Sequence, residues 1–132
     1  DMPIVAPLRE NAAQVVRSLD LSKHTNLNLV EPLGYLEFSF LLSNAAGIVT
    51  DSGNVAEEAT FTNVPCATLN SYTEHIETVK QGTNILVGED AQKLHAVVSD
   101  MVEGRWKATS IPDRWDGRSA ERIVQTLVDL VK

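Results

Sequence analysis

The sequence predicts an α/β fold in which a parallel sheet is flanked by helices. Short apolar runs alternate along the 132 residues with longer segments whose apolar side chains recur at helical spacing. Strands separated by helices need crossover connections, and such connections favour parallel pairing. At one junction, an apolar run over 48–50 ends at Asp51-Ser52-Gly53 and a helical segment begins. A chain of this length suits one domain, and we expect residues 1–132 to form it.

The first part of the chain predicts two strands and two helices. The apolar run 3–8 is a strand that ends, or lies at a sheet edge, near Pro7. Helical spacing of apolar residues over 11–19 predicts a helix, and 27–30 reads as the second strand. A further helix over 36–44 is apolar on most of its surface, so we expect its aromatic side chains in the core.

The same alternation continues to the end of the chain. We expect strands over 48–50, 66–69 and 84–87, and helices over 54–63, over 73–79 with Thr73 as N-cap, and after Gly88-Glu89-Asp90. Residues 104–117 contain two tryptophans, which predicts an ordered loop that closes the core. The segment 118–132 is a last amphipathic helix capped by Ser119.

Composition excludes several classes of partner. The net charge of −7 and pI near 4.8 argue against nucleic acid and anionic membranes, because both require a basic face. The single cysteine, Cys66, excludes an internal disulfide and predicts a buried packing residue in a cytoplasmic protein. The chain opens at Asp1 without an initiator methionine, so we expect a fragment of a longer protein.

The junction at residues 48–58 is a candidate anion-binding turn. A helix that begins directly after a strand leaves several amides unpaired, at the end where the helix dipole is positive. Ser52 adds a hydroxyl donor, Gly53 allows close approach of a ligand, and Glu57 or Glu58 follows one turn later to take a ribose. The same residues also fit a capping box from Asn54 to Glu57, or an N-cap at Asp51 or Ser52, so the turn alone leaves both interpretations open.

Several local motifs in this order resemble one family, the non-hydrolysing UDP-N-acetylglucosamine 2-epimerases. The resemblance covers nearly the whole chain from Glu31 onward and corresponds to the C-terminal half of those enzymes. The matching motifs are Glu31-Pro32-Leu33-Gly34-Tyr35, Thr50-Asp51-Ser52-Gly53 with Glu57-Glu58, Val64-Pro65-Cys66, Thr73-Glu74 with Glu77, Gly82-Thr83-Asn84 with Leu86-Val87-Gly88, and Trp115-Asp116-Gly117 with Ala120-Glu121-Arg122-Ile123.

The resemblance implies a Rossmann-like domain, the second of two in a glycosyltransferase-B architecture. Such enzymes invert C2 of the sugar of UDP-N-acetylglucosamine to give UDP-N-acetylmannosamine, by eliminating UDP and adding it back to an unsaturated sugar. By matching position, Ser52 and Gly53 would hold phosphate oxygens, Glu58 would bind the ribose, and Glu57 would be a helix cap. The family's catalytic carboxylates lie in its N-terminal domain, so we expect no catalytic residue here and no activity from this chain alone.

Some positions depart from the family pattern. Arg9 stands where the family has a histidine, and Asn70 and His75 stand where it has arginines. Arg9 can still attract a phosphate, whereas the bidentate arginine fork is lost at the other two positions. His75 would bind phosphate best when protonated, or is simply a solvated residue at a helix start. We expect no metal and no cofactor, since no spacing of His, Cys or carboxylates suggests a site.

The resemblance also places one more strand and helix before residue 1, in the centre of a 3-2-1-4-5-6 sheet. We therefore expect either that 3–8 pairs beside 48–50, or that another chain supplies the missing edge, and a homodimer is one such arrangement. The expected partners are UDP or a UDP-sugar and the missing N-terminal domain. The alternatives are a related UDP-sugar transferase of the glycosyltransferase-B class and a non-catalytic nucleotide-sugar-binding homologue.

Overall fold

A computed structural model describes residues 2–131 of the chain. The contacts divide it into two units, one ending at Leu41 and one beginning at Leu42. All strands in both units run parallel to their neighbours, as the alternation of short apolar runs and helices predicts. The α/β class with a parallel sheet flanked by helices is therefore confirmed.

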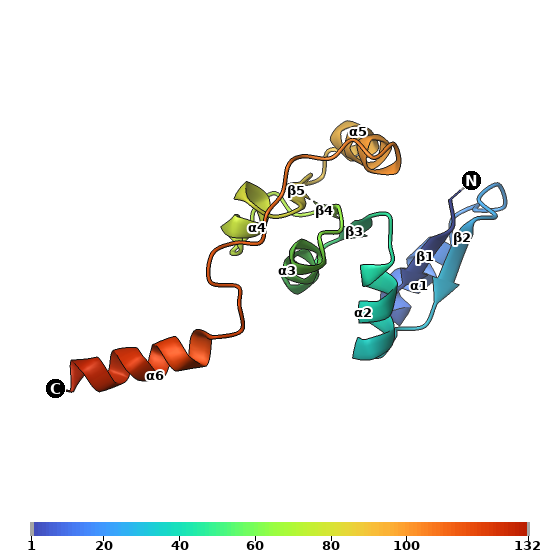
Figure 1. The fold of residues 1–132 in the computed structure, drawn as a ribbon. Coiled ribbons are helices and arrows are strands. Elements are labelled where there is room, and N and C mark those ends of the chain that lie inside the picture. The colour runs from blue at the N-terminus through green and yellow to red at the C-terminus, as the bar shows by residue number, and fades with distance from the viewer. Residues whose placement is uncertain (1, 132) are drawn as a thin grey trace. The chain divides into compact units, whose positions relative to one another are not determined.

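The first unit contains a small β-α-β element. Strands β1 (Ile4–Pro7) and β2 (Leu27–Val30) pair in parallel, and helix α1 (Glu10–Arg17) connects them (Figure 1). Helix α2 (Tyr35–Ser43) follows and crosses the boundary between the units. The expectation that its aromatic side chains lie in the core is wrong for Tyr35 and Phe40, which are 71% and 73% exposed. This helix is apolar on most of its surface, but only one of its faces packs against the rest of the protein, so apolar side chains on the other faces remain exposed.

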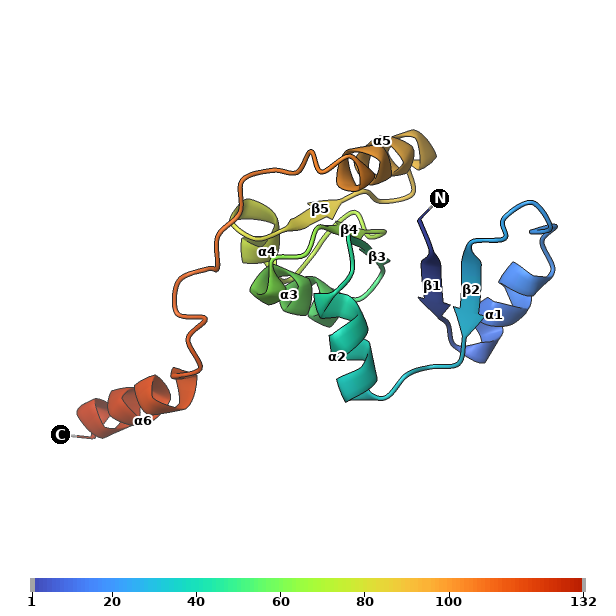
Figure 2. The same ribbon diagram turned by 45° about the vertical axis from the view of Figure 1, so that its right-hand side comes forward.

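The second unit is a three-stranded sheet covered on both faces. Its strands β3 (Ile48–Thr50), β4 (Cys66–Thr68) and β5 (Asn84–Leu86) lie in that order. Helices α3 (Gly53–Thr62) and α4 (Ile76–Lys80) lie on one side of the sheet, and α5 (Ala91–Val102) lies on the other (Figures 1 and 2). The elements alternate along the chain as predicted, and α5 is capped by Asp90, whose carboxylate accepts from the amides of Gln92 and Lys93.

Neighbouring residues of β4 face opposite layers of the core. Cys66 packs with Ala56 and Ala59 of α3, whereas Ala67 packs with Val87 and Met101 on the α5 side. These small side chains allow the helices to approach the sheet closely. Cys66 is fully buried, which confirms its predicted packing role, and burial raises the pKa of its thiol to about 11.

The strands form two sheets where the sequence predicted one. Within the described residues β1 pairs with β2, and β3 pairs with β4, so the first expected arrangement, 3–8 beside 48–50, is wrong. The second, an edge supplied by another chain, stays a prediction. The local β-α-β element already gives β1 a parallel partner along its whole length. The two sheets hold the strands expected on either side of the missing central strand, each in the expected order.

The first part of the segment after α5 is anchored to the second unit through Trp106, one of its two tryptophans, as predicted. Trp106 packs against the Ala67 cluster and donates from Nε1 to the carbonyl of Thr83 (2.9 Å). The Lys107 ammonium donates to the carbonyls of Val79 (2.6 Å) and Asn84 (2.8 Å), and its partial burial lowers its pKa. The loop is thus fastened to the backbone at both ends of the α4–β5 connection.

The last helix, α6 (Ser119–Leu130), has no buried residue among those described. Ser119 is its first residue and makes no cap, so the predicted N-cap is wrong by position. The start of the helix is held by Asp116, whose carboxylate accepts from the amide of Arg118 (3.1 Å) and from both terminal nitrogens of Arg122 (2.8 and 2.5 Å). The Arg122 hydrogen bonds, together with the Arg118 amide, lower the pKa of Asp116 to about 2.

Candidate functional site

The start of α3 has the geometry of an open helix end. β3 ends at Thr50, and Ser52 adopts an extended conformation (φ −96°, ψ 124°) immediately before the helix. The Ser52 hydroxyl makes no capping bond, and the first helical hydrogen bond runs from the amide of Ala56 to the Ser52 carbonyl (3.2 Å). Among residues 2–131, the backbone amides of Gly53, Asn54 and Val55 have no hydrogen-bond acceptor. This end therefore keeps free donors and the positive end of the helix dipole.

The capping-box interpretation of this turn is wrong. The helix begins at Gly53, so Asn54 lies inside the first turn and cannot be an N-cap. The Glu57 carboxylate, expected to act as a cap, lies instead 3.0 Å from Nδ1 of His75. The sequence does not indicate this pairing, because the two residues belong to different elements and only the fold brings them together.

His75 covers the start of α3. A β-carbon placed on Gly53 would lie 3.0 Å from Cδ2 and 3.2 Å from Nε2 of the imidazole. A residue with a side chain at position 53 would therefore push against the ring and displace it by a few tenths of an ångström. The His75 side chain is 30% exposed and that of Glu57 is 36% exposed, so the pair borders solvent.

The loop that carries His75 is held at its beginning by β3. The amide of Leu69 donates to the carbonyl of Thr50 (2.8 Å), and Nδ2 of Asn70 donates to the carbonyl of Asp51 (2.9 Å). The carboxyl ends of neighbouring parallel strands meet at one edge, which brings this loop beside the turn before α3. Asn70, at a position where arginine was expected, thus ties two loops together through an uncharged amide.

The end of that loop differs from the prediction. The helix begins at Ile76, and the hydroxyl of Thr73 accepts from the amide of His75 (3.0 Å) in a local turn instead of capping a helix. The predicted N-cap, Thr73, is therefore two residues before the observed one, His75. Because of this turn, His75 precedes α4 and is free to face α3.

A series of hydrogen bonds between buried polar side chains ends at the carbonyl of His75. The Thr68 hydroxyl donates to Oδ1 of Asn84 (2.6 Å), Nδ2 of Asn84 donates to the Thr78 hydroxyl (3.2 Å), and that hydroxyl donates to the His75 carbonyl (2.7 Å). Thr68, Thr78 and Asn84 are at most 2% exposed. Sequence reasoning missed this chain of hydrogen bonds; the only available signal was three polar residues inside segments predicted to be buried.

Glu58 and Arg9 are the remaining predicted site residues. Glu58 is half-buried on α3, and its carboxylate has no hydrogen-bond or ion-pair partner within residues 2–131. Arg9 is exposed and lies directly before α1 in the first unit. Ser52, Gly53 and His75 are thus brought together in the second unit, with Glu58 one turn further along the same helix.

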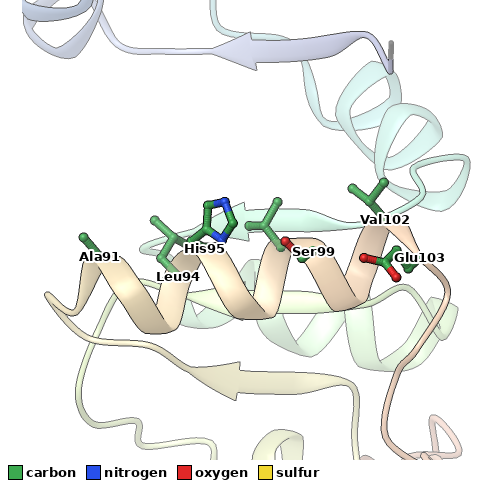
Figure 3. A pocket seen from close by; sticks show the side chains of 7 residues that line it. Ala91, Leu94, His95, Ser99, Val102 and Glu103 are labelled. Carbon is green, nitrogen blue, oxygen red and sulfur yellow. The ribbon is translucent and has the colours of Figure 1, made fainter.

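One other hollow lies on the surface of the second unit. It has a volume of about 460 Å³, and it is lined by side chains of α5, among them Leu94, His95 and Val102, and by Glu103 directly after the helix (Figure 3). It contains none of the predicted site residues. The described part of the chain contains no group of three or more His, Cys, Asp or Glu side chains placed to hold a metal ion. None of the helices in residues 2–131 combines the length and apolar character that crossing a membrane requires.

Comparison with known proteins assigns the family. The family model described as UDP-N-acetylglucosamine 2-epimerase matches residues 1–128. The UDP-N-acetylglucosamine 2-epimerase of Methanocaldococcus jannaschii is 45% identical over 81% of this chain and 29% of its own length. A UDP-N-acetylglucosamine 2-epimerase homolog of Methanococcus maripaludis is 50% identical over 83% of this chain and 30% of its own length.

A solved structure agrees with this assignment. The crystal structure of the M. jannaschii enzyme in complex with UDP-GlcNAc and UDP superposes on 96% of this chain with a TM-score of 0.72 and 38% identity. The match covers 35% of that enzyme's chain, so the present chain spans about a third of the length of the relatives it matches. The parallel strand order, the Ser-Gly turn at α3 and these similarities lead to one conclusion: the chain belongs to the UDP-N-acetylglucosamine 2-epimerase family.

Proposed function

We propose that residues 1–132 are the UDP-binding half of an epimerase that interconverts UDP-N-acetylglucosamine and UDP-N-acetylmannosamine. The observation that carries the proposal is the open start of α3, where free amides and the uncommitted Ser52 hydroxyl lie under the His75 ring. A diphosphate fits such a helix end, because amide donors and the helix dipole both favour an anion. The UDP and UDP-GlcNAc in the M. jannaschii structure support this assignment.

Each predicted residue has a defined role in the proposal. The amides and hydroxyl at Ser52 and Gly53 bind the diphosphate, and the Nε2 edge of His75 contacts it and donates to it when the ring is protonated. Glu58 accepts hydrogen bonds from the ribose hydroxyls, a role that its unpartnered carboxylate allows. Arg9 attracts the phosphates electrostatically. This local arrangement has to act against a net charge of −7, so binding should depend on specific hydrogen bonds more than on the overall field.

The chemistry itself belongs to the parent protein. Elimination of UDP requires removal of the C2 proton and departure of the diphosphate from C1, and addition of UDP to the unsaturated sugar reverses both steps. A site that holds the diphosphate stabilises the leaving group in both directions. The proton-transferring carboxylates are assigned to a missing N-terminal domain, so this chain alone should be inactive. The proposal has three further parts. Residues 1–132 form one domain, which the N-terminal domain of the parent protein completes. The parent protein is a homodimer, and it is located in the cytoplasm.

Calorimetric titration with UDP, UMP and UDP-GlcNAc tests nucleotide binding. The chain should bind UDP, and should bind UMP more weakly because one phosphate is missing. Gly53→Glu should abolish binding, since its carboxylate would occupy the anion position, and Glu58→Ala should weaken binding through the ribose. Glu103→Ala removes an equal charge directly after α5, on a side chain paired with Arg105, and should leave binding unchanged. Absence of binding to every uridine nucleotide would overturn the proposal.

A non-catalytic nucleotide-sugar-binding protein is the second candidate. The observation that favours it is Asn70, whose side chain is committed to the Asp51 carbonyl and supplies no charge to the site. An assay of the parent protein for conversion of UDP-GlcNAc separates the two candidates. Turnover supports the epimerase, whereas UDP binding without turnover supports the second candidate.

A further inference from the structure

The imidazole of His75 lies between a carboxylate and the start of a helix. Its Nδ1 is 3.0 Å from Oε1 of Glu57, and its other edge, with Cδ2 and Nε2, faces Gly53. Nε2 has no hydrogen-bond partner within residues 2–131. One ring nitrogen is therefore committed to Glu57, while the other borders the position proposed for the diphosphate.

This arrangement determines what His75 can offer to an anion. A carboxylate accepts only, so the hydrogen bond to Glu57 requires a proton on Nδ1. In the neutral ring Nε2 then carries a lone pair, which repels a phosphate oxygen. In the imidazolium Nε2 carries a proton as well and donates a charge-assisted hydrogen bond. The same ring thus opposes or supports diphosphate binding according to its charge.

The backbone of His75 is held in place independently of Glu57. The His75 carbonyl accepts from the Thr78 hydroxyl (2.7 Å), which is itself supported by the buried Asn84. The His75 amide donates to the Thr73 hydroxyl on the other side (3.0 Å). Because these bonds fix the backbone of His75, Glu57 sets the tautomer and orientation of the ring more than its location.

We infer that Glu57 is a positioning residue for diphosphate recognition, which acts by holding the Nδ1 proton of His75 and makes nucleotide-sugar affinity rise as the pH falls. The inference rests on the proposed function and deepens it. An arginine in place of His75 would donate at every physiological pH, so the dependence is specific to the histidine–glutamate pair. Glu57 is thereby separated from Glu58, which is assigned to the ribose.

Other charged residues lie on the segments that carry this pair. Glu74 and Glu77 lie on the segment of His75 itself, and Asp51 lies in the turn before α3. Within residues 2–131, Glu57 is the only carboxylate within 4.0 Å of a ring nitrogen of His75. Removal of Glu74 therefore changes the local field by the same charge without breaking the hydrogen bond to Nδ1.

The test is calorimetry of the full chain with UDP-GlcNAc between about pH 5 and pH 8, the range in which histidine titrates. UDP-GlcNAc is the probe because free UDP has a terminal phosphate that titrates in the same range. Affinity should be roughly fivefold higher at the acidic end, the effect of one charge-assisted hydrogen bond at a partly exposed site. In Glu57→Gln the amide can donate to Nδ1 and leave the Nε2 proton on a neutral ring, so the ratio should fall to within about twofold.

Two further variants complete the design. Glu74→Gln should retain the pH dependence of the unchanged chain, and His75→Arg should bind with little pH dependence whether Glu57 is present or replaced by Gln. Circular dichroism at each pH checks that all variants remain folded. Wild-type binding that does not change with pH, or that changes equally in Glu57→Gln, would overturn the inference and leave the proposed function standing. Failure of the unchanged chain to bind at any pH would contradict the proposed function itself.

Discussion

Thr68 and Asn84 are joined inside the β3–β4–β5 sheet by a hydrogen bond of 2.6 Å from the hydroxyl to Oδ1. Thr68→Val keeps the shape of the side chain but leaves Oδ1 of Asn84 buried without this donor. We expect a loss of about 1–3 kcal/mol in the free energy of unfolding, measured in urea. Thr62→Val is the matched control, because Thr62 is exposed on α3, and it should cost less than about 0.5 kcal/mol. Equal effects of the two substitutions would contradict the importance of the buried bond.

The contact between Gly53 and His75 gives a second prediction. Gly53→Ala places a methyl group 3.0 Å from Cδ2 of His75, closer than van der Waals contact, so the ring has to move. At about pH 5, where the inferred His75 contact supports binding, UDP-GlcNAc affinity should fall by about fivefold through loss of that contact. In a His75→Ala background the same Gly53→Ala change should cost less than about twofold, because the clash has been removed. Additive losses in the double variant would show that Gly53 acts independently of the ring.

Cys66 predicts a loss of stability in alkali. Burial raises the thiol pKa from 9.0 to about 11, so the folded chain retains the proton that the unfolded chain loses. This contribution is fully present below pH 9 and is lost as the pH rises through 11. It amounts to at most about 3 kcal/mol. The measurement is the difference in unfolding free energy between the unchanged chain and Cys66→Ala across this range, and a constant difference would contradict the prediction.

The lowered pKa of Asp116 predicts the opposite pH dependence: its contribution to stability is lost in acid. The Arg122 hydrogen bonds lower its pKa from 3.8 to about 2, so the ionised form is favoured where the start of α6 is formed. This contribution is present above pH 3.8 and is lost as the pH falls through 2. An NMR titration of the Asp116 carboxyl carbon should give a midpoint near 2, which Arg122→Gln should shift toward 3.8. Arg105→Gln, at the end of α5, should leave the midpoint unchanged.

Local patterns predicted most elements, because strands and helices are encoded by spacing and caps. The runs at 27–30 and 48–50 became strands with the predicted bounds, and Gly53–Thr62 differs from the predicted helix by one residue at each end. The start of α4 was misplaced because a threonine can accept from an amide in a turn as well as at a helix cap. The separation into two sheets was not predicted either, because the pairing of strands depends on contacts between segments that are far apart in the sequence.

The sequence predicted only the part of the candidate site that lies within one short segment. Ser52 and Gly53 followed from a strand–turn–helix junction, which is a local signal. The Glu57–His75 pair depends on the packing of the loop before α4 against α3, and no spacing along the chain indicates it. Their role in binding stays a prediction, as do those of Glu58 and Arg9.

The fastening of residues 106–110 has a practical consequence for shortening the chain. Trp106 and Lys107 satisfy the carbonyls of Thr83 and Asn84, and the amide of Ser110 reaches the carbonyl of Gln81 (2.8 Å). A protein truncated directly after α5 would expose these acceptors and uncover the Ala67 cluster. A shortened protein that contains the three-stranded sheet should therefore extend beyond Ser110, although the last helix that covers the sheet, α5, ends at Val102.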